Sequence, residues 1–390
     1  MSQKIKKIWR IMVEEWRTIL CQPLYLLLML GAPIFISYFF LDLMKAGAPD
    51  ELPVVVVDKD GSKTSRNITR NLDAFKNTRI ILHAKDFHEA ERAVQKGEAY
   101  GIYMIPENFE KDLMASRQPT LSFYTNNSVL IPASLQMSDM TTISALASGS
   151  VGRSIMLAKG ATEEQTKALL QPISVDTHAI SNHNTNYAVY LCPVLLPGIY
   201  NILVVLLTLY ILGMEVKYGL SRQLLRLADG NIMLAMAAKL LPMTVIFCIV
   251  CMAMNSVMFG ILGFPCHCGL AAMNLTSCLM VIANQCVAIF LYGLFPIMRL
   301  SLSIASIYSV LGLSLSGFTF PVSAFPQIFQ AWPYVCPIRQ YFLIYSEQAL
   351  NGFGWYYSWH YLVGMALFGL LPLLVMPRIK KIYEAMVYEP

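Results

Sequence analysis

Residues Tyr190–Met214 read YLCPVLLPGIYNILVVLLTLYILGM, a run of 25 residues without one charged side chain. An α-helix rises about 1.5 Å per residue and the hydrocarbon core of a bilayer is about 30 Å thick, so about 20 apolar residues span it. Five further stretches of the chain meet the same requirement. The six predicted membrane spans are residues 23–42, 190–214, 240–262, 270–295, 300–320 and 359–376.

The composition of the 390-residue chain agrees with a membrane protein. Hydrophobic residues make up 56% of the chain, charged residues 14%, and the mean hydropathy is +0.52. An ordinary soluble domain carries about 25% charged residues, so the composition excludes a soluble globular enzyme as well as a disordered chain. The charge is uneven, because 39 charged residues fall in the first 190 positions and 14 in the last 200. We therefore expect a water-soluble part in the first half.

The positions of Lys and Arg predict the orientation of the spans. Cytoplasmic segments of membrane proteins are enriched in these residues. With six spans and both termini cytoplasmic, every basic cluster falls on the cytoplasmic side, whereas the outer loop 263–269 has no charge. The basic residues concerned are Lys4, Lys6, Lys7, Arg10, Arg17, Lys217, Arg222, Arg226, Lys239, Arg299, Arg378, Lys380 and Lys381. The net charge of +5 is too small to indicate a nucleic-acid partner.

Residues 1–22 form a predicted amphipathic helix in the plane of the membrane surface. Apolar residues, among them Trp9 and Trp16, recur at helical spacing, and charged residues occupy the other face. Two interpretations stay open, a plain lipid anchor and a helix that docks a partner. A cleaved signal peptide ending at Ala48 is a third, but the apolar run exceeds the usual length of about 7–15 residues. We therefore interpret residues 23–42 as an uncleaved span.

Residues 43–188 form a predicted extracytoplasmic domain between the first two spans. The run Pro53–Val57 predicts a buried strand, and a helix beginning at Ser62 or Thr64 follows it. Strands alternating with helices predict a small α/β or α+β sheet. The remaining predicted elements are strands at 79–83, 100–105, 120–124 and 173–177 and helices at 86–94, 107–115, 129–158 and 162–170.

The chain lacks the sequence motifs of several common catalytic centres. It contains no G-x-x-x-x-G-K-[ST], H-E-x-x-H or G-x-S-x-G motif, which argues against a P-loop ATP site and two classes of hydrolase. Cys266-His267-Cys268 offers candidate ligands for a soft metal, but three ligands on one tight turn are few. The histidines of the predicted domain match no metal-site spacing: His83, His88, His178 and His183. We expect no bound metal and no cofactor in this chain.

The polar side chains inside the predicted spans are amides. They are Asn201, Asn255, Asn274, Asn284 and Gln285, and no span has Asp, Glu or Lys at its centre. Hydrogen bonding between helices is the simplest role for such amides, although polar residues in spans also mark transport paths. Because no titratable relay and no internal repeat is visible, an ion-coupled secondary carrier is disfavoured.

Residues 321–357 interrupt the helical pattern. The segment is apolar, aromatic and broken by prolines, and it contains Arg339 and Glu347. Irregular backbone is not stable against lipid, so the segment must be buried in protein or lie at the membrane surface. We predict short re-entrant helices that form an outer gate, with an interfacial belt of aromatic side chains as the alternative.

Several motifs resemble those of ABC-2-type exporter permeases. The sequences PVVVVDKD at 53–60 and AVQKGEAYGIYMIPENFEKDL at 93–113 resemble the outside domain of that family. The sequence YAVYLCPVLLPG at 187–198 resembles its return into the membrane, and GFTFP at 317–321 its broken outer segment. After the second span the family carries Glu, Gly-Thr and Thr-Pro. Here Glu215 and Gly219 match, whereas Leu220 and Ala228-Asp229 do not.

The resemblance implies a bacterial inner-membrane export subunit whose ATP-hydrolysing partner is a separate chain. Two copies, or one copy with a sister permease, would bind two cytoplasmic ABC ATPase subunits, and a periplasmic adaptor would contact the outside domain. The substrate would be hydrophobic or amphipathic. The implied ATPase-coupling residues are Glu215, Lys217, Tyr218, Gly219, Arg222, Arg226, Trp9 and Trp16. The implied residues of the translocation path or outer gate are Asn201, Tyr308, Phe318, Phe320 and Pro321.

Two other functions stay open as alternatives. A membrane-anchored sensor or assembly scaffold would use the 43–188 domain to bind a ligand and would not associate with an ATPase. A membrane-embedded enzyme would need converging titratable residues within the spans, and the sequence has none there.

Overall fold

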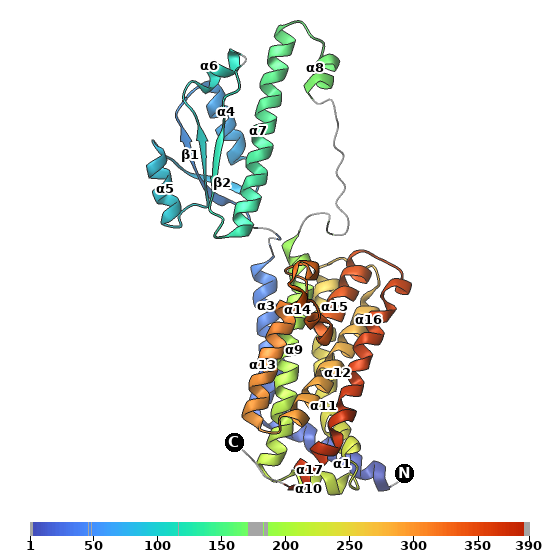
Figure 1. Ribbon diagram of the computed structural model, residues 1–390. Coiled ribbons are helices and arrows are strands. Elements are labelled where there is room, and N and C mark those ends of the chain that lie inside the picture. The colour runs from blue at the N-terminus through green and yellow to red at the C-terminus, as the bar shows by residue number, and fades with distance from the viewer. Residues whose placement is uncertain are drawn as a thin grey trace. The chain divides into compact units, whose positions relative to one another are not determined.

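The computed structural model describes residues 3–45, 47, 49–115, 117–170, 182 and 186–385. The chain divides into two compact units, one within Ala46–His178 and one formed by Met1–Lys45 together with Ala179–Pro390 (Figure 1). We call them the insert domain and the helical unit. The predicted strand at 173–177, together with His178 and His183, lies outside the described residues.

The insert domain is built on a four-stranded sheet with the strand order β2-β1-β3-β4. Strand β1 is parallel to β2 and β3, and β4 is antiparallel to β3. The strands are β1 (Leu52–Asp58), β2 (Thr78–His83), β3 (Gly101–Ile105) and β4 (Ser122–Thr125). The helices are α4 (Lys63–Asp73), α5 (Phe87–Gln95), α6 (Phe109–Met114), α7 (Leu130–Ala158) and α8 (Glu163–Leu170). The predicted alternation of strands and helices is therefore confirmed in the described part of this domain.

Strand β1 is the centre of the insert domain because its valines are buried on both faces of the sheet. Val54 and Val56 pack in one layer with residues of α4, α6 and α7, whereas Val55 and Val57 pack in a second layer with α5. Parallel strands covered on both sides show such continuous apolar runs. The side chain of Ser62 caps α4, as one of the two predicted alternatives required.

Helix α7 is joined to the sheet by buried polar contacts as well as by apolar packing. Gln136 Nε2 donates hydrogen bonds to the carbonyl oxygens of Leu52, at 3.3 Å, and Pro53, at 3.1 Å. Asp139 Oδ2 accepts a hydrogen bond of 2.8 Å from Thr78 Oγ1. These contacts fix the helix to the ends of β1 and β2.

The helical unit contains five helical stretches that are long and apolar enough to cross a membrane, counted over the described residues. They are Pro23–Leu43, Tyr187–Lys217, Ile232–Ile261, Leu270–Leu294 and Trp355–Ala385. The first of them consists of α2 (Pro23–Leu26), the π-helical turn η1 (Leu27–Gly31) and α3 (Ala32–Leu43). The next three correspond to α9 (Tyr187–Lys217), α11 (Ile232–Asn255) with the turn η2 (Ser256–Ile261), and α12 (Leu270–Leu294). The last consists of α16 (Trp355–Leu367), η6 (Phe368–Leu370) and α17 (Leu371–Ala385).

The predicted fifth span, 300–320, is too long. Helix α13 (Met298–Ser314) has 17 residues and ends six positions earlier than predicted. Turns and bends follow it, and Gly317 has a φ of +94°, which interrupts a helix. Conversely, the helix continues past residue 376, the predicted end of the last span, as far as Ala385, with Pro377 inside α17.

Helix α12 lies at the centre of the helical unit and packs against α9, α11, α13 and α17. Its amides bond to neighbouring helices. Asn284 Nδ2 donates to Asn201 Oδ1 of α9 at 3.0 Å, and Thr244 Oγ1 of α11 donates to Gln285 Oε1 at 2.7 Å. Asn255 Nδ2 of α11 also donates to Asn274 Oδ1 at 3.0 Å. The interpretation of these amides as links between helices is confirmed.

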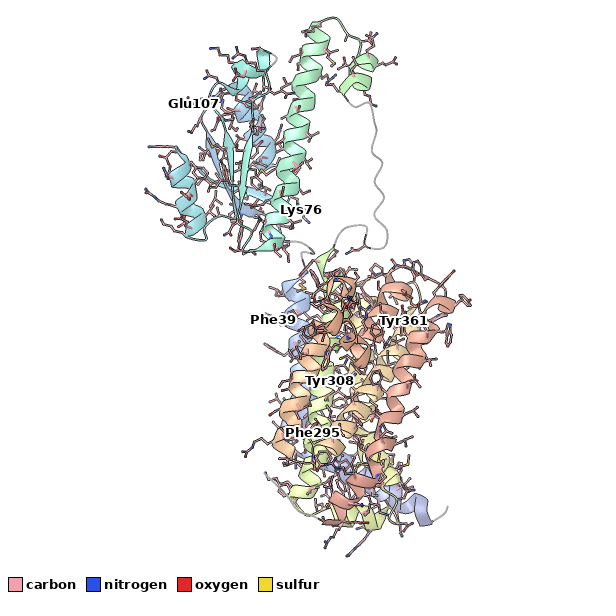
Figure 2. The ribbon with its side chains drawn as sticks, in the orientation of Figure 1. Phe39, Lys76, Glu107, Phe295, Tyr308 and Tyr361 are labelled. Atoms are coloured by element: carbon pink, nitrogen blue, oxygen red, sulfur yellow. The ribbon has the colours of Figure 1, made fainter. Side chains whose placement is uncertain are left out.

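The two ends of the helical unit differ in charge. Helix α1 (Gln3–Cys21), α10 (Ser221–Leu227) and the last turns of α17 gather at one end, whereas α14 (Gln327–Gln330) and α15 (Pro337–Ile344) lie at the other (Figure 1). Phe295 lies toward the first end and Tyr361 toward the second, with Tyr308 between them (Figure 2). We call the first the basic end, because the elements there carry the Lys and Arg clusters. The chain leaves the helical unit after α3 and returns at α9, both at the opposite end (Figure 1).

Removal of the Asp139 carboxylate tests the docking of α7. Asp139→Ala leaves the hydroxyl of Thr78, which is 2% exposed, without its acceptor, at a cost of about 1–3 kcal/mol. We expect amides of β1 and β2 to exchange hydrogen about fivefold faster or more in the full chain, followed by mass spectrometry. Ser138→Ala, at the exposed neighbouring position of α7, is the control. Unchanged exchange in Asp139→Ala would contradict this assignment.

Candidate functional site

Three charged side chains from distant parts of the chain meet near the basic end. Lys239 Nζ of α11 lies 2.7 Å from Glu15 Oε2 of α1 and 2.5 Å from Glu215 Oε1 of α9. The exposed fractions of the side chains are 5% for Lys239, 11% for Glu15 and 13% for Glu215. We call these residues the buried charge triad. They join the surface helix to two of the long apolar helices.

The triad is stable only as a set. A buried ammonium or carboxylate group loses its hydration, so each needs an opposite charge at close range. One lysine faces two carboxylates, and the cluster has one negative charge in excess when all three are ionised. Burial raises the pKa of Glu15, the attraction of Lys239 opposes that rise, and the negative charge of Glu215 adds to it.

A second set of contacts holds the α10 segment, residues 218–231, against its neighbours. Lys7 Nζ of α1 forms an exposed ion pair of 2.6 Å with Asp229 Oδ1. Ser221 Oγ donates to the carbonyl oxygen of Tyr383 at 3.0 Å, and Arg222 Nε donates to that of Glu384 at 2.7 Å. The α10 segment, α1 and the end of α17 therefore form one connected surface.

The residues predicted for partner coupling divide between the surface and the interior. Glu215 belongs to the buried charge triad, and its side chain is 13% exposed. Trp16 is half-buried against the helices, whereas Trp9 is 61% exposed. Gly219 forms a turn with a φ of +69°. The other residues predicted for partner coupling are exposed and lie together on or beside the α10 segment. They are Lys217, Tyr218, Arg222 and Arg226.

The residues predicted for a path or gate do not form one site. Asn201 and Tyr308 line the same small interior cavity, beside Gly198 and Gly312. Asn201 is only 5% exposed, and Tyr308 donates a hydrogen bond of 2.7 Å to the carbonyl oxygen of Val335. This cavity lies between α9, α12, α13 and the start of α15.

The other three predicted gate residues lie after the end of α13. Phe318 is buried and packs edge-on against Phe342, with ring centroids 6.3 Å apart. Phe320 is 54% exposed. Pro321 lines a separate pocket of about 490 Å³, to which Arg339 also contributes. We call it the outer pocket.

The segment 321–357 has two structurally different parts. The first comprises the short helices η3 (Val322–Ala324), α14 and η4 (Trp332–Val335), which carry many exposed apolar side chains. The second comprises α15 and the π-helical turn η5 (Tyr345–Leu350), and it packs against α12 and α16. Tyr341 and Tyr345 are fully buried there. The second part is therefore packed within the helical unit, whereas the first part exposes apolar side chains.

The Cys266-His267-Cys268 turn brings two thiols together without completing a metal site. The sulfur atoms of Cys266 and Cys268 lie 4.0 Å apart. Within the described residues, no three His, Cys, Asp or Glu side chains are placed to hold a metal ion. The thiol of Cys268 lowers the pKa of Cys266 by hydrogen bonding, and the same interaction together with burial raises the pKa of Cys268.

Long apolar helices with an inserted α/β domain are typical of a multi-pass membrane protein. The chain belongs to the ABC-2 transporter family, because the model of the family described as ABC-2 family transporter protein matches residues 17–376. The family resemblance predicted from the motifs is thus confirmed. Members of this family are typically non-catalytic membrane subunits of ABC transporters, and membership implies association with ABC ATPase subunits. The comparison with curated proteins found no match.

Sequence reasoning did not single out Glu15 and Lys239 of the buried charge triad, nor Arg339 of the outer pocket, as candidate site residues. Glu15 stands on the helix face that also carries Ile11 and Ile19, and a carboxylate among buried apolar residues was the available signal. Lys239, by contrast, lies just before the predicted span 240–262, among the basic residues expected on the cytoplasmic side. Its place inside α11 became visible only because that helix begins at Ile232.

Removal of the central charge tests the buried charge triad. Lys239→Met leaves two buried carboxylates without a counter-charge, and we expect a loss of about 3–5 kcal/mol in stability. Combining Lys239→Met with Glu15→Gln and Glu215→Gln should restore most of that loss, since no buried charge is left. Thermal unfolding of the full chain in detergent, followed by tryptophan fluorescence, measures both effects.

The matched control is Lys7→Met, because the Lys7–Asp229 ion pair is exposed. Exposed ion pairs contribute about 0–1 kcal/mol, so the control should unfold near the wild-type temperature. A Lys239→Met protein as stable as the control would contradict a stabilising triad.

The Cys266–Cys268 pair predicts unequal thiol reactivity. The thiolate is the reactive form, so the thiol with the lowered pKa reacts first. We expect iodoacetamide to alkylate Cys266 faster than Cys268 at neutral pH, and Cys268→Ala to slow the alkylation of Cys266. Site-resolved tandem mass spectrometry measures both rates, with the exposed Cys21 as internal reference. Equal rates at the two cysteines would contradict the assignment of Cys268 as the donor in this contact.

Proposed function

We propose that this chain is the membrane-spanning permease subunit of an ABC exporter in a bacterial inner membrane, with six spans and both termini in the cytoplasm. Helix α13, with 17 residues, is at the lower limit of about 17–25 residues for a span. The elements that gather at the basic end carry Lys and Arg clusters in their sequences, which supports a cytoplasmic location for that end. The insert domain, which connects to the opposite end, would then be extracytoplasmic.

The observation that carries this proposal is the connected surface at the basic end. It presents the exposed side chains of Lys217, Tyr218, Arg222 and Arg226 on or beside the α10 segment. ATP hydrolysis would occur in a separate ATPase bound there, because this sequence has no P-loop motif, and the permease itself would need no cofactor.

The ion pairs that hold this surface would couple movement of the ATPase to movement of the long apolar helices. The Lys7–Asp229 ion pair joins the α10 segment to α1, and the buried charge triad joins α1 to α9 and α11. A displacement of α10 by a closing ATPase would therefore move α1 and the ends of two long helices together. Glu215 would transmit the movement through Lys239 and would not touch the ATPase.

The remaining parts of the proposal concern partners and substrate. Two copies, or this chain and a sister permease, would pair through apolar faces that the helical unit leaves uncovered, such as that of α3 with Phe35 and Ile307 of α13. A periplasmic adaptor contacting the insert domain rests on the family resemblance. A hydrophobic or amphipathic substrate suits a path built from apolar and amide side chains.

Charge reversal on the α10 segment tests the proposed ATPase contact. The double variant Arg222→Glu/Arg226→Glu should reduce the amount of cytoplasmic ABC ATPase that co-purifies with the full chain by about tenfold, equivalent to about 1.4 kcal/mol. Arg92→Glu/Lys96→Glu, at an exposed position of α5 and at the exposed residue directly after it in the insert domain, is the matched control. Equal recovery of the ATPase with both double variants would overturn the proposed docking surface.

A further inference from the structure

The arginine of the outer pocket is isolated from the other basic residues. From Tyr187 onward the sequence contains nine Lys and Arg residues, and eight of them belong to elements of the basic end or to the start of α13. Arg339, on α15, is the exception. Because a cation at this end of a membrane protein opposes the usual distribution, its presence calls for a specific interaction.

The guanidinium of Arg339 has unused hydrogen-bonding capacity. Its Nη1 donates to the carbonyl oxygen of Ser316 at 2.7 Å, whereas its Nε is buried and has no partner among the described residues. Its Cζ lies 5.9 Å from the centre of the Tyr334 ring. The nearby carboxylate of Glu347 accepts hydrogen bonds from Ser358, at 2.5 Å, and from Tyr361, at 3.0 Å. Within the described residues, Arg339 forms no ion pair.

The backbone leaves room for this guanidinium. Gly317 lines the outer pocket, and a Cβ atom at this position would collide with Nη1 of Arg339. The φ of +94° at Gly317 also disfavours any other residue. The pocket of about 490 Å³ further includes polar groups of Ser323 and Gln330. It is therefore a polar cavity with one positive charge.

The surroundings of the outer pocket are apolar. Four large side chains of residues 320–335 that carry no polar atom are more than half exposed: Phe320 at 54%, Ile328 at 86%, Phe329 at 52% and Val335 at 53%. An arginine binds carboxylate and phosphate groups through two parallel hydrogen bonds, and exposed apolar side chains suit an attached hydrocarbon chain. The two features together match an amphiphile that carries an anionic group.

We propose that the outer pocket binds the carboxylate or phosphate group of an anionic amphiphile through Arg339. The apolar side chains of residues 320–335 would contact its hydrocarbon part. The amphiphile could be a bilayer phospholipid or the transported molecule, and only its assignment as transported molecule rests on the proposed export function.

Binding to the full chain, purified in dodecylmaltoside, tests this proposal in the absence of any ATPase. The probes are dioctanoyl phosphatidylglycerol, which is anionic, dioctanoyl phosphatidylcholine, which is zwitterionic, and dodecanoate; native mass spectrometry measures the bound fraction. We expect the wild type to prefer phosphatidylglycerol over phosphatidylcholine, and Arg339→Gln to weaken phosphatidylglycerol binding by about tenfold. Arg339→Lys should lose less, because the charge is kept. Arg299→Gln, at the start of α13, should bind as the wild type does.

A second variant protects the test against a folding defect in Arg339→Gln. Ile328→Asp changes a side chain that is 86% exposed and places a negative charge beside the pocket, so it should also weaken phosphatidylglycerol binding. The proposal is overturned if neither variant changes that binding, or if the wild type binds both phospholipids equally.

Competition distinguishes the sources of the anionic group. Displacement of phosphatidylglycerol by dodecanoate supports a site for anionic amphiphiles in general, which admits a transported molecule. Failure of dodecanoate to compete supports a phospholipid site. Displacement of phosphatidylglycerol by inorganic phosphate at millimolar concentration would overturn the proposal of an amphiphile site and indicate a site for a free anion. Because no ATPase takes part in the binding experiment, a negative result at the outer pocket would leave the proposed docking of the ATPase at the α10 segment unaffected. Likewise, a negative result in the ATPase co-purification would leave the proposed binding of an anionic amphiphile unaffected.

Discussion

The structure of the helical unit depends on the requirement that a buried charge has a partner. The side chain of Lys239 is 5% exposed, and its ammonium group is neutralised only where Glu15 and Glu215 approach it together. Helix α1 therefore cannot leave the surface of α9 and α11 without exposing or isolating a charge. A segment that its sequence describes as a membrane-surface helix becomes in this way a part of the bundle.

The two ends of the helical unit use charge differently. At the basic end the charges pair with one another, and the pairs connect α1 to α9, α11 and the α10 segment. At the opposite end Arg339 has a backbone oxygen and an aromatic ring as neighbours. Paired charges suit the transmission of movement between helices, whereas an unpaired cation in a cavity suits the binding of an anion. Between the ends, hydrogen bonds between uncharged amides hold α12 to α9 and α11.

Elements that depend on local sequence were predicted well. The valines of β1, the cap at Ser62 and the apolar runs of α9, α11 and α12 each carry their signal within a few residues. The end of α13 was predicted wrongly, and α17 continues past the predicted end of the last span. Hydropathy continues past Ser314, although the backbone turns at Gly317, and Pro377 does not end α17. Composition does not reveal where these helices end, because helix ends depend on backbone conformation and on packing.

The sequence by itself determined that this chain is a membrane protein with a more highly charged insert, because hydropathy and charge act over stretches of neighbouring residues. It also carried the motifs of the ABC-2 family. Only the tertiary structure decided which charges meet. Glu15 and Lys239 are 224 positions apart, and Arg339 meets Ser316 across 23 positions. No spacing rule predicts such pairs, since helix packing and the path of the backbone bring them together.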